Sequence, residues 1–216
     1  MNCAICGVRK PKRYCPGVRG DICAICCGTE REQSVDCPLD CEYLRAAHLH
    51  ERAPELAPDQ IPDADVEIGE EFLAGNETYL YLLSQALWEG VVESSGVTDY
   101  DVRDALAALV SARKALSTGI YYETRPTNPY AAMVYEAVTE AIEDMRRRER
   151  EALGAATALR DSTVLKLLIF LRRLEASTNN GRKRSRAFID MIRRLVETAS
   201  PSDEETGDSE EPRIIL

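Results

Sequence analysis

The sequence predicts a small cysteine-rich module, followed by an all-α helical bundle of about five helices and a disordered acidic tail. All eight cysteines lie between Cys3 and Cys41. From Glu70 onward, apolar residues recur at three- and four-residue spacing, which is typical of core-facing helices. Residues 201–216 carry six acids and one arginine, a composition that does not support a packed core. The chain therefore divides into a cysteine-rich module (1–50), a Pro- and acid-rich linker (51–69), a helical bundle (70–199) and a tail (200–216) with an apolar C-terminus.

Composition favours a soluble cytoplasmic protein. The 216 residues are 44% hydrophobic and 30% charged, with a net charge of -10, which is the range of globular domains. The N-terminus lacks the basic and apolar regions of a secretory signal. The longest apolar run, Val164 to Leu171, is interrupted by Lys166 and is too short to span a bilayer, so no membrane contact is expected. In a reducing compartment, clustered cysteines indicate metal ligands rather than disulfides.

The cysteine spacing predicts two zinc ions. Cys3-x-x-Cys6 and Cys23-x-x-Cys26 are tight knuckles that direct two thiolates each at one tetrahedral ion. The remaining four thiols would hold the second ion, with the two histidines as alternative ligands in place of Cys15 or Cys27. The ligands expected at the second site are Cys15, Cys27, Cys37 and Cys41, with His48 and His50 as the possible substitutes.

This arrangement resembles the binuclear cross-brace zinc fingers of the B-box, RING or HIT type, over residues 3–50 only. The resemblance rests on the two knuckles, Cys15, and the wider pair Cys37-x-x-x-Cys41. The chain departs from the pattern because Cys15 has no close upstream partner and because Cys26 and Cys27 are adjacent. What the resemblance implies is a folded zinc platform, with ubiquitin transfer or complex assembly as the functions of such families.

The zinc is expected to be structural. A fifty-residue module with few large apolar residues buries too little to fold alone, and structural zinc contributes about 10–16 kcal/mol per site in zinc-finger peptides. A catalytic zinc needs an open coordination position and a nearby acid or base. The alternative is a redox sensor in which Cys26 and Cys27 are the reactive thiols.

Start signals predict the first three helices of the bundle. Asn76 is expected to cap the first, whose apolar stripe includes Leu83 and Leu87. Thr98 with Asp101 resembles a capping box for the second, which Gly119 would end. Asn128-Pro129 supplies the cap and first-turn proline of the third, which is expected to continue through the charged stretch 146–151.

Start and turn signals also predict the last two helices of the bundle. Asp161 or Ser162 is expected to cap the fourth helix, whose broad apolar face predicts a central position in the bundle. Asn179-Asn180-Gly181 is a strong turn signal. The fifth helix is expected over about Arg182 to Thr198.

Two basic segments stand out against the acidic total. Cations at a helix start oppose the helix dipole at a cost of about 0.3–1 kcal/mol each, so the segment at the start of the fifth helix invites an anionic partner. The acidic stretch Asp203 to Glu211 lies close enough along the chain to compete for it. The first segment comprises Arg9, Lys10, Lys12, Arg13 and Arg19, and the second comprises Arg182, Lys183, Arg184 and Arg186.

The sequence therefore favours a non-enzymatic zinc-binding interaction adaptor or regulator with a protein partner. It contains no phosphate-binding loop, and no histidine follows His50 that could serve a triad or a helical di-metal site. The first alternative is a nucleic-acid-binding regulator that uses Arg9–Arg19 and Arg182–Arg186, with the acidic tail as autoinhibitor. Redox sensing is the second. The apolar tip Ile214–Leu216 is a candidate docking element.

Overall fold

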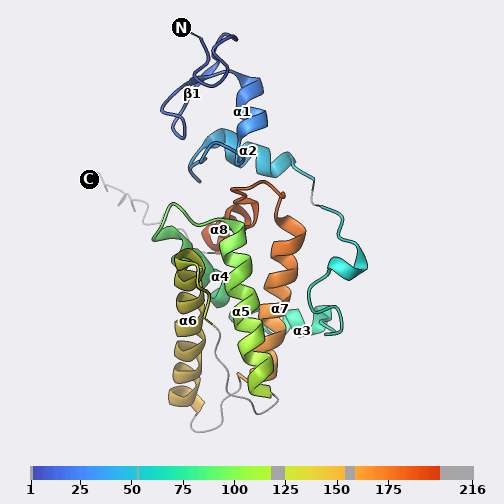
Figure 1. Cartoon of the computed structure of the whole chain (residues 1–216). Helices are drawn as coiled ribbons and strands as arrows, with labels where there is room; N and C mark the ends of the chain where they lie inside the picture. Colours follow the sequence, from blue (N-terminus) through green and yellow to red (C-terminus); the bar gives the residue numbers. More distant parts are fainter. Residues whose placement is uncertain (1, 53, 118–124, 154–158, 200–216) are drawn as a thin grey trace, which may run out of the picture.

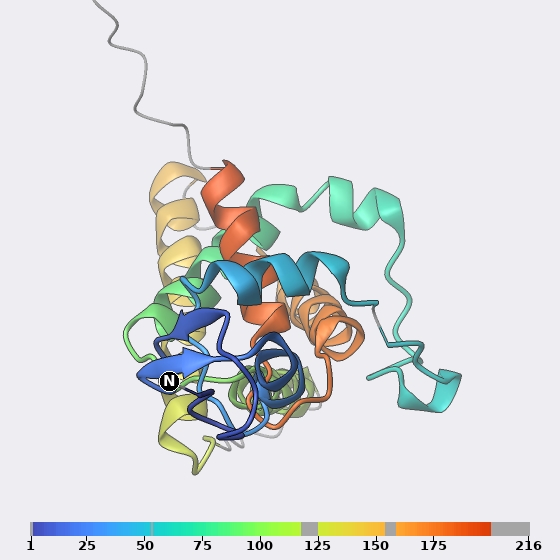
Figure 2. The same cartoon turned by 90° about the horizontal axis from the view of Figure 1, so that it is seen from above.

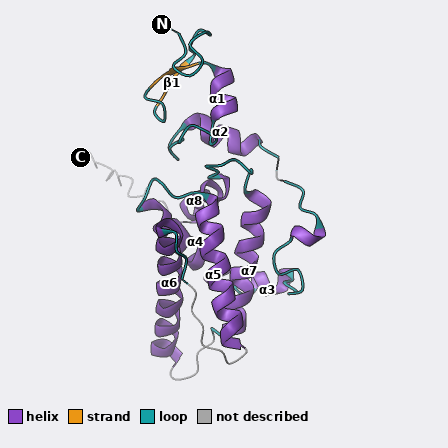
Figure 3. Cartoon of the chain, in the orientation of Figure 1, coloured by secondary structure: helices purple, strands orange, loops and turns teal. Residues whose placement is uncertain are grey.

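The chain folds as a cysteine-rich module seated on one end of a helical bundle (Figure 1), and the view from above shows the module over that end (Figure 2). The computed structural model describes residues 2–52, 54–117, 125–153 and 159–199. Helices dominate these ranges, and the described strands lie in the module (Figure 3). The described residues form eight α-helices: α1 (Ala24–Glu30), α2 (Glu42–His50), α3 (Glu70–Ala74), α4 (Glu77–Val92), α5 (Asp99–Ser117), α6 (Pro129–Leu153), α7 (Asp161–Thr178) and α8 (Ala187–Ala199).

The module contains a short antiparallel hairpin and two helices. Strand β1 (Arg13–Cys15) pairs with β2 (Gly20–Ile22), with Tyr14 opposite Asp21. Helix α2 follows directly on Cys41, which is its N-cap residue. The module has its own small apolar cluster, separate from that of the bundle, in which Ile22 and Leu44 are almost fully buried among cysteines. With so little apolar core, the module fits the expectation that metal is needed for its stability.

The linker is fastened to the bundle. It contains a 3-10 turn, η1 (Pro58–Gln60), and then reaches the side of α5 and α7. The carboxylate of Asp63 accepts hydrogen bonds from Lys114 (2.6 Å) and Arg172 (2.8 Å). Arg173 donates to three linker carbonyl groups, including that of Val66 at 2.8 Å. These contacts hold an extended segment in place although it forms little regular structure.

The bundle consists of five of the described helices, α4 to α8. Helix α4 packs against α6 and α8, and α5 packs against α6, α7 and α8. The predicted apolar stripes form one continuous core, in which Leu83, Leu106 and Leu168 are buried. The sequence predicts α7 at the centre of the bundle; α5 takes the more central place, since α7 contacts mainly α5 and, to a smaller extent, α8.

The local start signals are partly confirmed. The Asp101 carboxylate accepts hydrogen bonds from the backbone N–H (2.8 Å) and hydroxyl (2.7 Å) of Thr98. The Asn128 side chain accepts the N–H of Tyr130 at the start of α6 (3.0 Å). Asn76 does precede α4, but its side chain donates to the carbonyl group of Phe72 instead of capping.

Two helix starts differ from the prediction. Arg160, not Asp161 or Ser162, is the N-cap residue of α7, so Asp161 lies in the first turn. Helix α8 begins at Ala187, five residues after Arg182, because residues 182–186 are held in an irregular conformation by contacts with other segments. Gly119 and the tail lie outside the described residues, as do the tail-based predictions for Asp203–Glu211 and Ile214–Leu216.

Helix α8 is capped from another helix. The buried Asp99 carboxylate, in the first turn of α5, accepts the N–H groups of Phe188 and Ile189, both at 3.1 Å. It also accepts the hydroxyl of Ser185 at 2.6 Å, while the Asp99 N–H donates to the Ser185 carbonyl group. Burial raises the pKa of Asp99 to about 6, although these three donors favour the ionised form. A cap of this kind fixes where α8 begins.

The substitution Asp99→Ala is expected to lower the free energy of unfolding by about 1–3 kcal/mol, since it removes a cap and leaves buried N–H groups without an acceptor. Urea denaturation followed by circular dichroism measures the change. Asp104→Ala, an exposed position on the same helix, is the control and should change stability by less than about 0.5 kcal/mol. Equal effects for the two variants would contradict the tertiary cap.

Candidate metal centre

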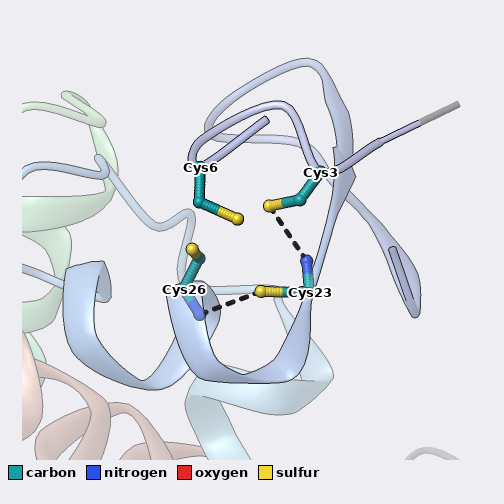
Figure 4. Close-up of side chains that lie close together, drawn as sticks. All are labelled: Cys3, Cys6, Cys23 and Cys26. Carbon is teal, nitrogen blue, oxygen red and sulfur yellow. Dashed lines mark hydrogen bonds between the residues drawn. The ribbon is translucent and has the colours of Figure 1, made fainter. Parts of the chain in front are cut away.

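Four cysteines converge at the tip of the module. The thiol sulfur atoms of Cys3, Cys6, Cys23 and Cys26 all lie within 4.8 Å of one another, and Figure 4 shows them pointing into one space. The first pair comes from the loop before β1. The second pair begins α1, with Cys23 at the N-cap position and Cys26 in the first turn. This geometry is compatible with one tetrahedral zinc ion, and it brings together the four ligands that the sequence assigns to the first site.

Backbone N–H groups prepare this site for thiolates. The N–H of Cys23 approaches the Cys3 sulfur at 3.3 Å, and the N–H of Cys26 approaches the Cys23 sulfur at 3.4 Å. The backbone of Cys6, with further N–H donors, lowers the pKa of Cys3 to about 6. The Arg9 side chain hydrogen-bonds to Cys23, which raises the pKa of Arg9. Part of the first basic segment therefore serves to balance thiolate charge.

The other four cysteines lie in the same apolar cluster but less closely together. Burial raises the pKa of Cys27, and the charges of Cys15 and Cys41 raise it further. Burial also raises the pKa of Cys37 to about 11, with the same two neighbours contributing. Cysteines of the second group thus interact with one another. Among the described residues, however, only the first four cysteines reach the 4.8 Å proximity.

The vicinal pair does not have the environment of reactive thiols. Burial raises the pKa of Cys26 to about 12, and Cys27 is also shifted upward. A redox-sensing thiol requires the opposite shift together with exposure. These upward pKa shifts give no support to redox sensing.

His48 lies at the junction of module and bundle, where both of its ring nitrogens contact carboxylates. Its Nε2 atom is 3.1 Å from the Glu32 carboxylate, and its Nδ1 atom is 3.2 Å from the Asp190 carboxylate on α8. All three side chains are about 1% exposed. His50, in contrast, is exposed at the end of α2. The structure therefore places His48 in a buried ion-pair network and not beside Cys15 or Cys27.

A second group of metal-ligating atoms occurs at this junction. Atoms of Glu32, His48 and Glu51 also lie within 4.8 Å of one another. Protein donors already occupy these carboxylates: the Asn180 amide donates to Glu32 at 2.8 Å and to Glu51 at 3.0 Å, and Arg31 donates to Glu51 at 2.7 Å. This group is accordingly a weaker metal candidate than the four thiols.

Charge pairing holds the junction together. Burial disfavours a charged imidazole, but hydrogen bonds to Asp190 and Glu32 outweigh it and raise the pKa of His48 to about 9. Against the opposing effect of burial, the same contacts lower the pKa of Glu32 and of Asp190. At neutral pH, the histidine is therefore a buried cation between two carboxylates.

Most of the second basic segment is used inside this junction. The Arg186 side chain donates to the carbonyl groups of Val97 (2.9 Å), Ser95 (2.5 Å) and Cys37 (2.5 Å), and its N–H donates to Glu32 at 2.7 Å. Further contacts come from its two neighbours in the segment: Arg182 donates to the carbonyl group of Arg31 at 2.7 Å, and Arg184 pairs with Asp36 at 3.4 Å, whereas Lys183 is exposed.

The first basic segment is mostly exposed. Arg9, Lys10, Lys12 and Arg19 lie on the surface of the module, around the hairpin. Arg13 instead stacks over the Tyr43 ring, with 3.7 Å from the guanidinium to the ring centre. Tyr14, which points out of the hairpin, is 61% exposed.

The surface of the bundle carries a groove that the sequence did not indicate. It runs between α4 and α6 and has a volume of about 760 Å³. Gly90 lies at the crossing of the two helices, where a Cβ atom would come within 3.0 Å of the Ala137 Cβ. The periodic stripes of α4 and α6 predict which faces are buried, but not which helices become neighbours.

No family model, curated protein or solved structure matches the chain. The resemblance to cross-brace zinc fingers is therefore supported only as far as the four-cysteine cluster of the module. No helix in the described ranges combines the length and apolar character that a membrane span needs.

Protonated His48 is expected to stabilise the protein, and this contribution should disappear as the pH rises through about 9. The folded-state pKa lies above the unfolded value, so the folded state binds more protons and the stabilisation is complete only below the unfolded pKa of about 6.5. Urea unfolding of the zinc-loaded protein between pH 6 and 10 measures the loss.

His48→Gln should be less stable than wild type at pH 6, with a flatter profile up to pH 10. His50→Gln, at an exposed position on the same helix, should retain the wild-type profile. A wild-type stability that rises between pH 7 and 9.5 would exclude the buried imidazolium.

Proposed function

We propose that this chain is a non-enzymatic, zinc-stabilised adaptor that acts through protein–protein contacts. The observation that carries the proposal is the open groove between α4 and α6, which is long, solvent-facing and unoccupied by any described segment of the chain. Grooves between helices are common docking sites for a partner segment. The module and its metal hold the bundle from one end and leave this face free.

The proposal includes two zinc ions in a cross-braced module. The first is held by the four clustered thiols. The second would be held by Cys15, Cys27, Cys37 and Cys41, whose mutual charge effects and shared apolar cluster support the assignment. His48 is left out of the ligand set because its two ring nitrogens already contact carboxylates.

Metal analysis of purified protein by mass spectrometry should find about two zinc ions per chain, as expected for eight thiolates in four-ligand sites. Cys23→Ser and Cys37→Ser should each lose one ion, because they belong to different sites. Ser34→Ala, an exposed position between Cys27 and Cys37, is the control and should retain both ions. The second site would be excluded if the wild type held one zinc ion that Cys23→Ser loses and Cys37→Ser keeps.

A second candidate function is nucleic-acid binding through the module. The exposed residues Arg9, Lys10, Lys12 and Arg19 beside exposed Tyr14 favour it, since such surfaces combine phosphate contacts with a stacking platform. Arg182 and Arg186 contribute less to this candidate because their guanidinium groups are engaged within the chain.

Affinity capture on the immobilised zinc-loaded protein is expected to retain a partner that depends on the groove. Charge reversal by Glu89→Arg with Glu140→Arg should release it, because both side chains are exposed at the groove edge. The matched control is Glu70→Arg with Glu71→Arg, two exposed acids on α3. Mass spectrometry of the retained proteins compares the three baits.

A protein retained by wild type and the α3 control, but not by the groove variant, supports the adaptor. A protein that the groove variant retains as well as the wild type does would contradict the adaptor function. Capture of DNA or RNA with a steep salt dependence, lost in Lys10→Gln with Lys12→Gln, would favour the second candidate instead.

A further inference from the structure

The groove has the shape of a helix-binding site. Its lining runs from Leu82 to Glu93 on α4 and from Met133 to Arg148 on α6. The two helices are antiparallel, because Gly90 meets Val134 while Tyr79 hydrogen-bonds to Glu149. At about 1.5 Å per residue, the α6 side of the groove is about 22 Å long, which equals about four helical turns.

Small and flexible apolar side chains form the floor. Ala137 and Ala141, one turn apart on α6, lie beside Met133, and all three are only partly buried. Small residues let a partner approach the backbone closely, and methionine adapts to the side chains that it meets. An apolar stripe on an incoming helix would thus find a complementary strip.

Carboxylates line both edges of this floor. Glu89 on α4 and Glu93, the C-cap residue of that helix, are one turn apart and repel each other. Glu136 and Glu140 are one turn apart on α6, where Glu136 pairs with Arg125 at 3.4 Å. Within the described part of the chain, Glu89, Glu93 and Glu140 take part in no salt bridge. Six acids and only two arginines line the groove. Both arginines lie toward the C-terminal end of α6 and pair with Asp144.

We propose that the groove binds a basic amphipathic helix of a partner protein, with the apolar face of that helix on the small-residue floor and its lysines or arginines between the two rows of carboxylates. This inference rests on the proposed adaptor function and specifies the partner's chemistry. The cationic character follows from charge complementarity, because a neutral or acidic partner would leave Glu89, Glu93 and Glu140 without a compensating cation. The acidic residues 201–211 of the chain itself have the wrong charge for this position.

Three designed peptides test the proposal on the zinc-loaded full chain. Each is about 16 residues long, which matches the groove length. The first has a leucine and alanine stripe flanked by lysines, the second replaces the lysines with glutamates, and the third has the composition of the first in shuffled order without a stripe. Fluorescence anisotropy at low salt should show that the first peptide binds at least about tenfold more tightly than the others, because it alone matches both charge and shape.

Groove variants locate the binding site. Glu89→Gln with Glu140→Gln should weaken binding of the first peptide by about fivefold, because two exposed charge contacts are lost. Glu70→Gln with Glu71→Gln changes the net charge equally on α3 and should change binding by less than about twofold, as expected for screened charges outside the contact. Circular dichroism confirms that both variants keep the wild-type fold.

Several outcomes would overturn the inference. These are equal binding of the stripe-bearing and shuffled lysine peptides, equal weakening by the groove and α3 variants, or absence of binding by the first peptide. A concentration-dependent dimer in sedimentation that Glu89→Gln with Glu140→Gln abolishes would assign the groove to a second copy and also overturn it. If the peptide fails while the captured partner still depends on the groove, the adaptor function stands and the basic-helix partner does not.

Discussion

A buried network of charges joins the cysteine-rich module to the bundle, and the start of α8 depends on it. Glu32 follows α1 in the module, yet its carboxylate accepts the N–H of Arg186 at the beginning of α8 and contacts His48. Asp99 reaches the same helix start from α5. Buried charges are costly unless they are paired and hydrogen-bonded. Removal of one member leaves the others uncompensated, so the network acts as a unit.

This constraint links the metal centre to the helices. The thiol cluster includes the first turn of α1, and α1 leads directly to Glu32. Glu32 adopts a left-handed conformation (φ 55°), which turns the chain into the junction. Helix α8, whose start it helps to fix, packs against α4, and α4 forms one wall of the groove. A continuous series of contacts therefore runs from the thiols to the groove, with each step carried by rigid elements.

Features that depend on neighbouring residues could be predicted from the sequence, and features that depend on distant residues could not. The two Cys-x-x-Cys knuckles are local, and their spacing alone indicated one four-thiol cluster. The Asn128 cap and the apolar stripe through Leu83 and Leu87 are likewise local patterns. The start of α8 is different, because Asp99 lies almost ninety residues earlier in the sequence and nothing near it marks the pairing.

The same reason explains why the groove and the role of His48 could not be predicted. Apolar periodicity shows that α4 and α6 each bury one face, but the choice of neighbour follows from the packing of the whole bundle. Histidine beside a cysteine cluster suggested a zinc ligand, since the residue types match. Only the fold shows that α2 directs His48 toward α8 and away from the thiols.

The distribution of arginines changes how the charge of this chain should be interpreted. In sequence, residues 160–200 form a basic region that suggested an anionic ligand. In the fold, Arg172 and Arg173 hold the linker, while Arg182 and Arg186 hold the module. Carboxylates and carbonyl groups, most of them from the first seventy residues, accept hydrogen bonds from these arginines. The engagement of these cations within the chain weakens the nucleic-acid alternative. The exposed Glu89, Glu93 and Glu140 beside the apolar floor of the α4–α6 groove support the cationic partner that we propose.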